Sequence, residues 1–135
     1  MYDSLSSAIT EIVRFTNEHQ IEAEFYIHSI GQLKGDVPDS FWARFEKRPG
    51  VYLLFGSTGH ALRYIGMSQR DTGTRLFGWL FRNRLGDEVD HEDLVLSVVL
   101  QQEYMAPALE SFLISKLNPA LNRQGRRTIT PPAAT

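Results

Sequence analysis

The stretch GVYLLFGSTGHALRYIG, residues 50–66, predicts a β-hairpin. Two short apolar runs flank a turn that contains two glycines, and glycine permits the positive backbone angles that hairpin turns require. Each run carries one tyrosine, Tyr52 on the first and Tyr64 on the second. With the turn centred on Thr58, we expect the two tyrosines to lie directly opposite each other on one face of the hairpin.

Two interpretations of the tyrosine pair are open from these residues alone. Tyrosine is a common strand residue, and a cross-strand aromatic pair stabilises a hairpin by about 0.2–1 kcal/mol, so the pair can be purely structural. Alternatively, two phenol groups on one face are aimed at a functional site. A phosphate-binding loop is excluded, because no Gly-Lys-Ser/Thr follows the turn glycines.

The composition is that of one globular domain. The chain has 135 residues, of which 42% are hydrophobic and 22% charged, and this length is sufficient for a single core. It has no cysteine, which excludes disulfides and thiolate metal sites and permits a reducing compartment. The N-terminal residues lack a secretory pattern, and no apolar run approaches the length of a membrane span. We therefore expect a cytoplasmic protein without a membrane partner.

The rest of the chain predicts helices and one further strand around the hairpin. Apolar residues at helical spacing, β-branched runs and proline–glycine breaks define these elements. In order, we expect a helix over 4–20, a strand or extended connector over 21–30, a short helix over 39–47, the hairpin, a helix over 73–83, a strand over 94–102 and a helix over 106–117. This order predicts an α+β fold, with a small antiparallel three-stranded sheet flanked by helices and an extra N-terminal helix.

Five features follow one another along the chain, with fitting element types between them. They are the signatures Gly50-Val51-Tyr52 and Tyr64-Ile65-Gly66, then Arg75, Glu110 and Asn122. With these features in this order, residues 49–122 resemble the GIY-YIG nuclease family. Two positions depart from the pattern, since Met67 stands where members often have lysine and Trp79 where many have histidine.

The resemblance implies a metal-dependent endonuclease that hydrolyses phosphodiester bonds in DNA, as in DNA repair. It assigns Glu110 as the ligand of Mg²⁺ or Mn²⁺, cations that one carboxylate can anchor. It makes Arg75 the group that binds phosphate oxygens. It also makes one tyrosine the general base, and we assign Tyr52 to that role with Tyr64 as its hydrogen-bonding partner. Asn122 would hold the site together. From the residues alone, a helix glutamate such as Glu110 is usually a solvated residue, and Asn122 is equally a turn residue.

The charge distribution indicates a surface for nucleic acid, although the net charge is −2. The two segments that carry the family features are basic, and the segment between them, 87–103, is acidic. A basic side facing phosphate with an acidic side elsewhere is typical of DNA-binding proteins. The basic residues expected to contact nucleic acid are Arg63, Arg70, Arg82, Arg84, Lys116, Arg123, Arg126 and Arg127.

These features predict three segments. Residues 1–48 form a helical extension packed on the domain, 49–122 the GIY-YIG-like nuclease domain, and 123–135 a mobile basic tail. The alternative function is a catalytically weak domain that acts as a DNA-binding or protein-interaction module. A third possibility is a structural subunit of a larger nuclease, with the N-terminal helix as its docking face. The expected partners, besides DNA, are a protein that supplies target choice or a second copy of the chain.

Overall fold

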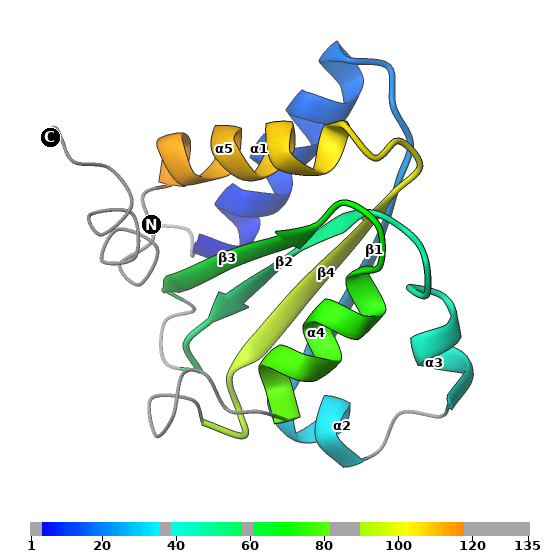
Figure 1. Ribbon diagram of the computed structural model, residues 1–135. Coiled ribbons are helices and arrows are strands. Elements are labelled where there is room, and N and C mark those ends of the chain that lie inside the picture. Colours follow the sequence, from blue (N-terminus) through cyan, green and yellow to red (C-terminus); the bar gives the residue numbers. More distant parts are fainter. Residues whose placement is uncertain (1–3, 36–38, 58–60, 82–89, 118–135) are drawn as a thin grey trace, which may run out of the picture.

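The computed structural model describes residues 4–35, 39–57, 61–81 and 90–117, and Figure 1 shows the arrangement of its elements. The helices and strands are α1 (Ser4–Glu18), β1 (Ala23–Ser29), α2 (Ile30–Gly35), α3 (Asp39–Ala43), β2 (Gly50–Phe55), β3 (Leu62–Ser68), α4 (Thr72–Phe81), β4 (Leu94–Leu100) and α5 (Met105–Leu117). The strands form one sheet in the order β1-β4-β2-β3, and every neighbouring pair is antiparallel. The predicted α+β class, with helices flanking an antiparallel sheet, is confirmed.

The sheet has four strands where the sequence predicts three. The additional strand is β1, which comes from the ambiguous segment 21–30 and pairs along its whole length with β4. Its sequence, AEFYIHS, alternates between apolar and polar residues, but the strand is short and lies at the sheet edge, where its side chains are half-buried or exposed on both faces. The segment is a strand and not an extended connector.

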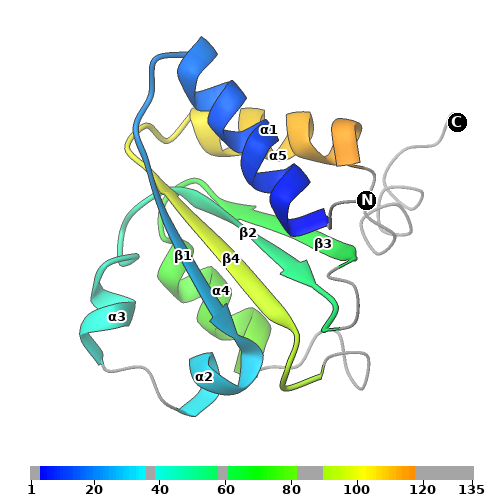
Figure 2. The ribbon, with the colours of Figure 1, turned by 180° about the vertical axis from the view of Figure 1, so that it is seen from behind.

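Helices cover both faces of the sheet and enclose a core on each side (Figures 1 and 2). Amphipathic α1 packs with α5 on one face, where Ile12, Phe15 and Leu109 meet the inward side chains of the strands. On the other face, α2, α3 and α4 pack on Tyr52 and its neighbours through residues such as Phe41 and Leu76. The strands therefore alternate between two buried surfaces, and Val51 and Tyr52 point to opposite cores.

The hairpin register differs from the expected one. Tyr52 pairs with Gly66, and Tyr64 pairs with Leu54, with an irregularity in the pairing after Leu54. The prediction that the two tyrosines oppose each other directly is wrong, because the strands are offset by two residues from that register. An offset of two keeps both side chains on the same face, so the tyrosines are diagonal neighbours with ring centroids 6.4 Å apart.

A buried aspartate fastens the loop before β4 to the end of the hairpin. The carboxylate of Asp93 accepts hydrogen bonds from the backbone N–H groups of Ser57 (2.9 Å) and Asp90 (3.0 Å). It also forms an ion pair with Arg63, at 3.3 Å. In addition, the Asp93 carbonyl accepts the N–H of Ile30, at 2.8 Å. One acidic residue thus connects β4 to β2, β3 and α2.

Asp93→Ala is expected to destabilise the fold by about 3 kcal/mol, because it leaves a half-buried guanidinium and two backbone donors without their acceptor. Urea unfolding measures the change. Asp90→Ala is the matched control, since it keeps the N–H that Asp93 accepts and removes an exposed carboxylate that accepts the N–H of Glu92. Equal stability losses in the two variants would contradict the role given to Asp93.

Candidate active site

The side chain of Tyr52 lies directly on the bare backbone of Gly66. A Cβ atom added at Gly66 would come within 2.5 Å of Tyr52 Cζ and 2.7 Å of its hydroxyl oxygen. Real Cβ atoms do not approach other atoms this closely, so only glycine fits opposite this ring. The phenol of Tyr52 therefore extends from β2 across β3, which is one edge of the sheet.

Gly50 permits a second close approach. A Cβ atom there would lie 2.3 Å from the carbonyl oxygen of Val98 and 2.9 Å from the Thr72 hydroxyl. The missing side chain lets β2, β4 and the first turn of α4 meet. Both signature glycines are thus explained by packing, and a glycine inside a strand is the sequence signal for such an approach.

The start of α4 is held in place by hydrogen bonds on both sides. Asp71 caps the helix, since its carboxylate accepts the N–H of Thr74 at 3.0 Å. Burial raises the pKa of this carboxyl, but the Thr74 bond and the nearby Lys47 together bring it below its ordinary value. On the other side, the N–H and hydroxyl of Thr72 both donate to the Arg48 carbonyl, at 2.8 and 2.7 Å. These contacts fix the first turn, from which Arg75 projects.

Three of the predicted catalytic residues, Tyr64, Arg75 and Glu110, act on the phenol of a fourth, Tyr52. Burial, followed by the neighbouring phenol of Tyr64, raises the pKa of Tyr52 well above its ordinary value. Arg75 opposes this shift through its charge and through a hydrogen bond to Tyr52, and the carboxylate of Glu110 adds to it. The structure therefore brings together side chains from β2, β3, α4 and α5. Asn122 lies outside the described residues.

Glu110 reaches this place from the opposite face of the sheet. Its neighbours on α5, Leu109 and Leu113, are fully buried in the core beneath the helix, and Glu110 itself is half-buried. Because α5 packs mainly on the edge strand β3, a side chain on the border of the helix can approach the edge that Tyr52 crosses from the α4 side. The sheet edge is thus the place where both layers contribute polar groups.

The acidic groups at this edge suit a cation that needs few protein ligands. Within the described parts of the chain, no three His, Asp or Glu side chains gather as a metal cage. Magnesium keeps most of its water ligands and accepts a single carboxylate as its protein anchor. Glu110, whose charge is felt at the Tyr52 hydroxyl, meets that requirement.

The basic residues predicted to contact nucleic acid differ in their surroundings. Arg63 is engaged by the buried Asp93 and therefore serves the fold. Arg70 and Lys116 are exposed, and the Lys116 ammonium lies 5.8 Å from the centre of the Phe112 ring. The others, Arg82, Arg84, Arg123, Arg126 and Arg127, lie outside the described residues, as does the predicted tail. Among the helices that the structure describes, none combines the length and the apolar character needed to cross a membrane.

Comparison with known proteins gives two similar solved structures. One is the crystal structure of the GIY-YIG N-terminal endonuclease domain of UvrC from Thermotoga maritima bound to its catalytic divalent cation, magnesium; it is 28% identical and has a TM-score of 0.45. The match covers 62% of this chain and 92% of that chain. The other is an asparagine-to-alanine point mutant of the same domain with its catalytic divalent cation, 28% identical over 62% of this chain and 91% of that chain, with a TM-score of 0.43. No family model matches the chain, and no curated protein does. The chain thus contains a segment similar to a GIY-YIG domain.

Gly66→Ala is expected to lower stability by about 1–3 kcal/mol, because the new methyl group displaces the buried Tyr52 ring. Thermal and urea unfolding measure this loss. Gly56→Ala is the matched control on the same hairpin, since its methyl group would meet nothing closer than 3.7 Å. Similar unfolding midpoints for the two variants would show that the ring does not depend on Gly66.

Proposed function

We propose that this chain is a divalent-metal-dependent endonuclease that hydrolyses phosphodiester bonds in DNA. The observation that supports it is the convergence of Tyr52, Tyr64, Arg75 and Glu110 at one edge of the sheet, seen in their joint effect on the Tyr52 phenol. Two phenols, one guanidinium and one carboxylate supply a proton acceptor, an anion-binding fork and a cation anchor. A purely structural tyrosine pair requires neither the arginine nor the glutamate.

Phosphodiester hydrolysis needs an activated water, stabilisation of charge on phosphorus and help for the leaving oxygen. Arg75 is exposed at the start of α4, and its planar fork suits two phosphate oxygens. Glu110 would hold Mg²⁺ or Mn²⁺, and a bound cation polarises the phosphate and neutralises the leaving oxygen. We assign Asn122 to supporting the site through side-chain hydrogen bonds.

The environment of the two phenols favours Tyr64 as the general base. Tyr52 is only 2% exposed, and its raised pKa means that burial and Tyr64 oppose its ionisation. A base must reach a water molecule in the solvent-facing part of the site, and Tyr64 is half-buried rather than buried. Since neighbouring phenolates repel each other, only one of the two ionises. We therefore exchange the roles that the sequence analysis assigns to the two tyrosines. Tyr64 is the general base that takes the proton from water, and Tyr52 donates a hydrogen bond to it.

DNA would bind along the basic segments beside this edge. Exposed Arg70 and Lys116 can contact the phosphate backbone, and the basic residues outside the described ranges would extend that surface. We propose residues 49–122 as the catalytic unit, with 1–48 as an extension that completes the sheet. A chain without cysteine suits the reducing cytoplasm, where DNA repair is one role for such an activity.

A second candidate function is binding of DNA or of a protein without cleavage. The observation that favours it is the environment of the Tyr52 phenol. Burial of Tyr52 and the raised pKa of its hydroxyl are features of a structural tyrosine as well. Met67, which is half-buried and packs against the core on the α5 side, supplies no charge at the position after the second signature. A cleavage assay on supercoiled, branched and single-stranded DNA with Mg²⁺ or Mn²⁺ distinguishes the two functions.

Glu110→Gln is expected to reduce metal-dependent cleavage by orders of magnitude, because the amide keeps the size of the side chain but loses the charge that anchors a cation. Cleavage by the unaltered chain should also stop in excess chelator. Glu103→Gln, at an exposed position just before α5, is the control and should cleave normally. Normal cleavage by Glu110→Gln, or cleavage in chelator, would contradict the mechanism.

Tyr64→Phe is expected to slow cleavage by about 10²–10⁴-fold, the usual cost of losing a general base. Tyr52→Phe should slow it less, since that hydroxyl only positions its neighbour, and both variants should bind DNA as tightly as the parent chain. Single-turnover rates and binding constants measure these effects. A larger loss in Tyr52→Phe restores the opposite order, and full activity in both variants would contradict a general-base role for either tyrosine.

A further inference from the structure

Strand β1 is an open edge of the sheet, opposite the edge that carries the candidate active site. It pairs with β4 on one side, and no other strand in the described ranges lies on its outer side, as Figure 2 shows from behind. An open edge presents unpaired backbone N–H and C=O groups to other chains. Proteins usually block such an edge with lysine, proline or a bulge. The sequence AEFYIHS contains no lysine or proline, and its register with β4 is regular.

The same strand exposes apolar side chains on the face shared with α1 and α5. Phe25 is 37% exposed and Ile27 is 46% exposed. They are two of the four large hydrophobic residues that are exposed in the described parts of the chain. Unpaired backbone groups and uncovered apolar side chains therefore occur together along one strand, the combination that strand pairing between chains buries.

We propose that a second copy of this chain pairs with β1, antiparallel and centred on Tyr26, so that two four-stranded sheets join into one. This register aligns all seven residues of the strand, of which Ser29 already donates its N–H to the side chain of Gln32, at 2.9 Å. Phe25 then lies opposite Ile27 of the other copy, Glu24 opposite its His28, and Tyr26 opposite Tyr26. Each apolar residue meets an apolar residue on one face, and each carboxylate meets an imidazole on the other, so that the strand is complementary to itself.

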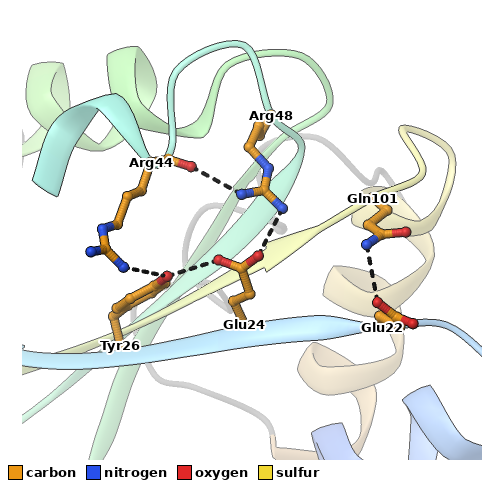
Figure 3. Close-up of polar contacts among 6 residues, drawn as sticks. All are labelled: Glu22, Glu24, Tyr26, Arg44, Arg48 and Gln101. Carbon is orange, nitrogen blue, oxygen red and sulfur yellow. Dashed lines mark hydrogen bonds and ion pairs between the residues drawn. The ribbon is translucent and has the colours of Figure 1, made fainter. Parts of the chain in front are cut away.

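The polar side of this strand is already ordered in the single chain (Figure 3). The Tyr26 hydroxyl donates to Glu24 at 2.8 Å, and Arg48 donates to the other carboxylate oxygen at 3.2 Å. Arg44 donates to the Tyr26 hydroxyl at 3.4 Å. The hydrogen bonds from Tyr26 and Arg48 lower the pKa of Glu24, so that its carboxylate is ionised and can accept a hydrogen bond from the imidazole of the second copy. Little side-chain order remains to be gained on pairing.

Other antiparallel registers between the two copies of β1 form fewer favourable contacts. An antiparallel register displaced by two residues in either direction leaves part of the strand unpaired and removes the pairing of Glu24 with His28. Because the pairing centred on Tyr26 puts equivalent faces together, α4 of each copy lies on the same side of the joined sheet. The edge strand β3 and the side chains of Tyr52 and Tyr64 stay accessible in both copies. The inference is independent of cleavage, and its test uses no nuclease assay.

Sedimentation of the full chain over the micromolar range tests the association. We expect a dimer for the unaltered chain and at least a tenfold larger dissociation constant for Ile27→Lys, since a lysine on an edge strand opposes pairing. Val13→Lys is the matched control, because Val13 is also a β-branched residue and is 40% exposed on α1. A monomeric unaltered chain, or equal weakening by both variants, overturns the proposal; a monomer would leave β1 to a strand of another protein.

Cysteine cross-linking tests the register, because the chain has no cysteine of its own. Directly opposed residues lie about 4.5–5.5 Å apart between Cα atoms, within the Cα–Cα range of a disulfide, about 4.4–6.8 Å, so Tyr26→Cys should give a covalent dimer on oxidation. In this register the two copies of residue 28 are displaced by four residues, or about 13 Å along the strand, so His28→Cys should stay unlinked. Circular dichroism checks that both variants fold. Equal linking of the two variants, or linking of His28→Cys alone, overturns the register.

Discussion

The contact between the Tyr52 ring and the backbone of Gly66 is the constraint on which the candidate site depends. Tyr52 belongs to an inner strand and is almost completely buried, yet its hydroxyl reaches the neighbourhood of Arg75 and Glu110. It does so because Gly66 leaves the surface of β3 bare, where any Cβ atom would occupy the space of the ring. The Tyr52 ring is thus both a core side chain and the carrier of the hydroxyl at the site. Because the ring is held by core packing, the position of its hydroxyl is held as well.

Residues that precede the GIY-YIG-like segment help to fix that segment. The carbonyl oxygen of Arg48 accepts two hydrogen bonds from Thr72, and the carbonyl of Phe45 accepts one from Gly73 at 3.2 Å. Thr72 and Gly73 form the first turn of α4. The segment 45–49 therefore determines where Arg75 projects. Further upstream, β1 supplies the fourth strand and buries one side of β4. The first part of the chain is therefore part of the sheet and of both cores.

Charged groups near the sheet divide between stabilising the fold and forming the site. Asp93 and Arg63 neutralise each other where β4 begins, and Asp93 also accepts two backbone N–H groups, so that neither is free for a ligand. At the other end of the hairpin, Arg75 and Glu110 act in opposite directions on one buried phenol. Opposed charges around a poorly solvated hydroxyl make its protonation sensitive to anything that binds to either charge.

The sequence by itself determined the hairpin and the helices α1, α3, α4 and α5, because turn glycines and helical periodicity are local patterns, but it did not predict α2. It did not determine the hairpin register, the place of β1 beside β4, or the engagement of Arg63 by Asp93. Each of these depends on residues 30 or more positions apart in the chain or on an irregularity in pairing, which local patterns do not encode. The raised pKa of Tyr52 likewise follows first from burial of its ring among residues distant in the chain. Only the tertiary structure decided it, because desolvation is a property of the packed chain and not of the residues that flank a tyrosine.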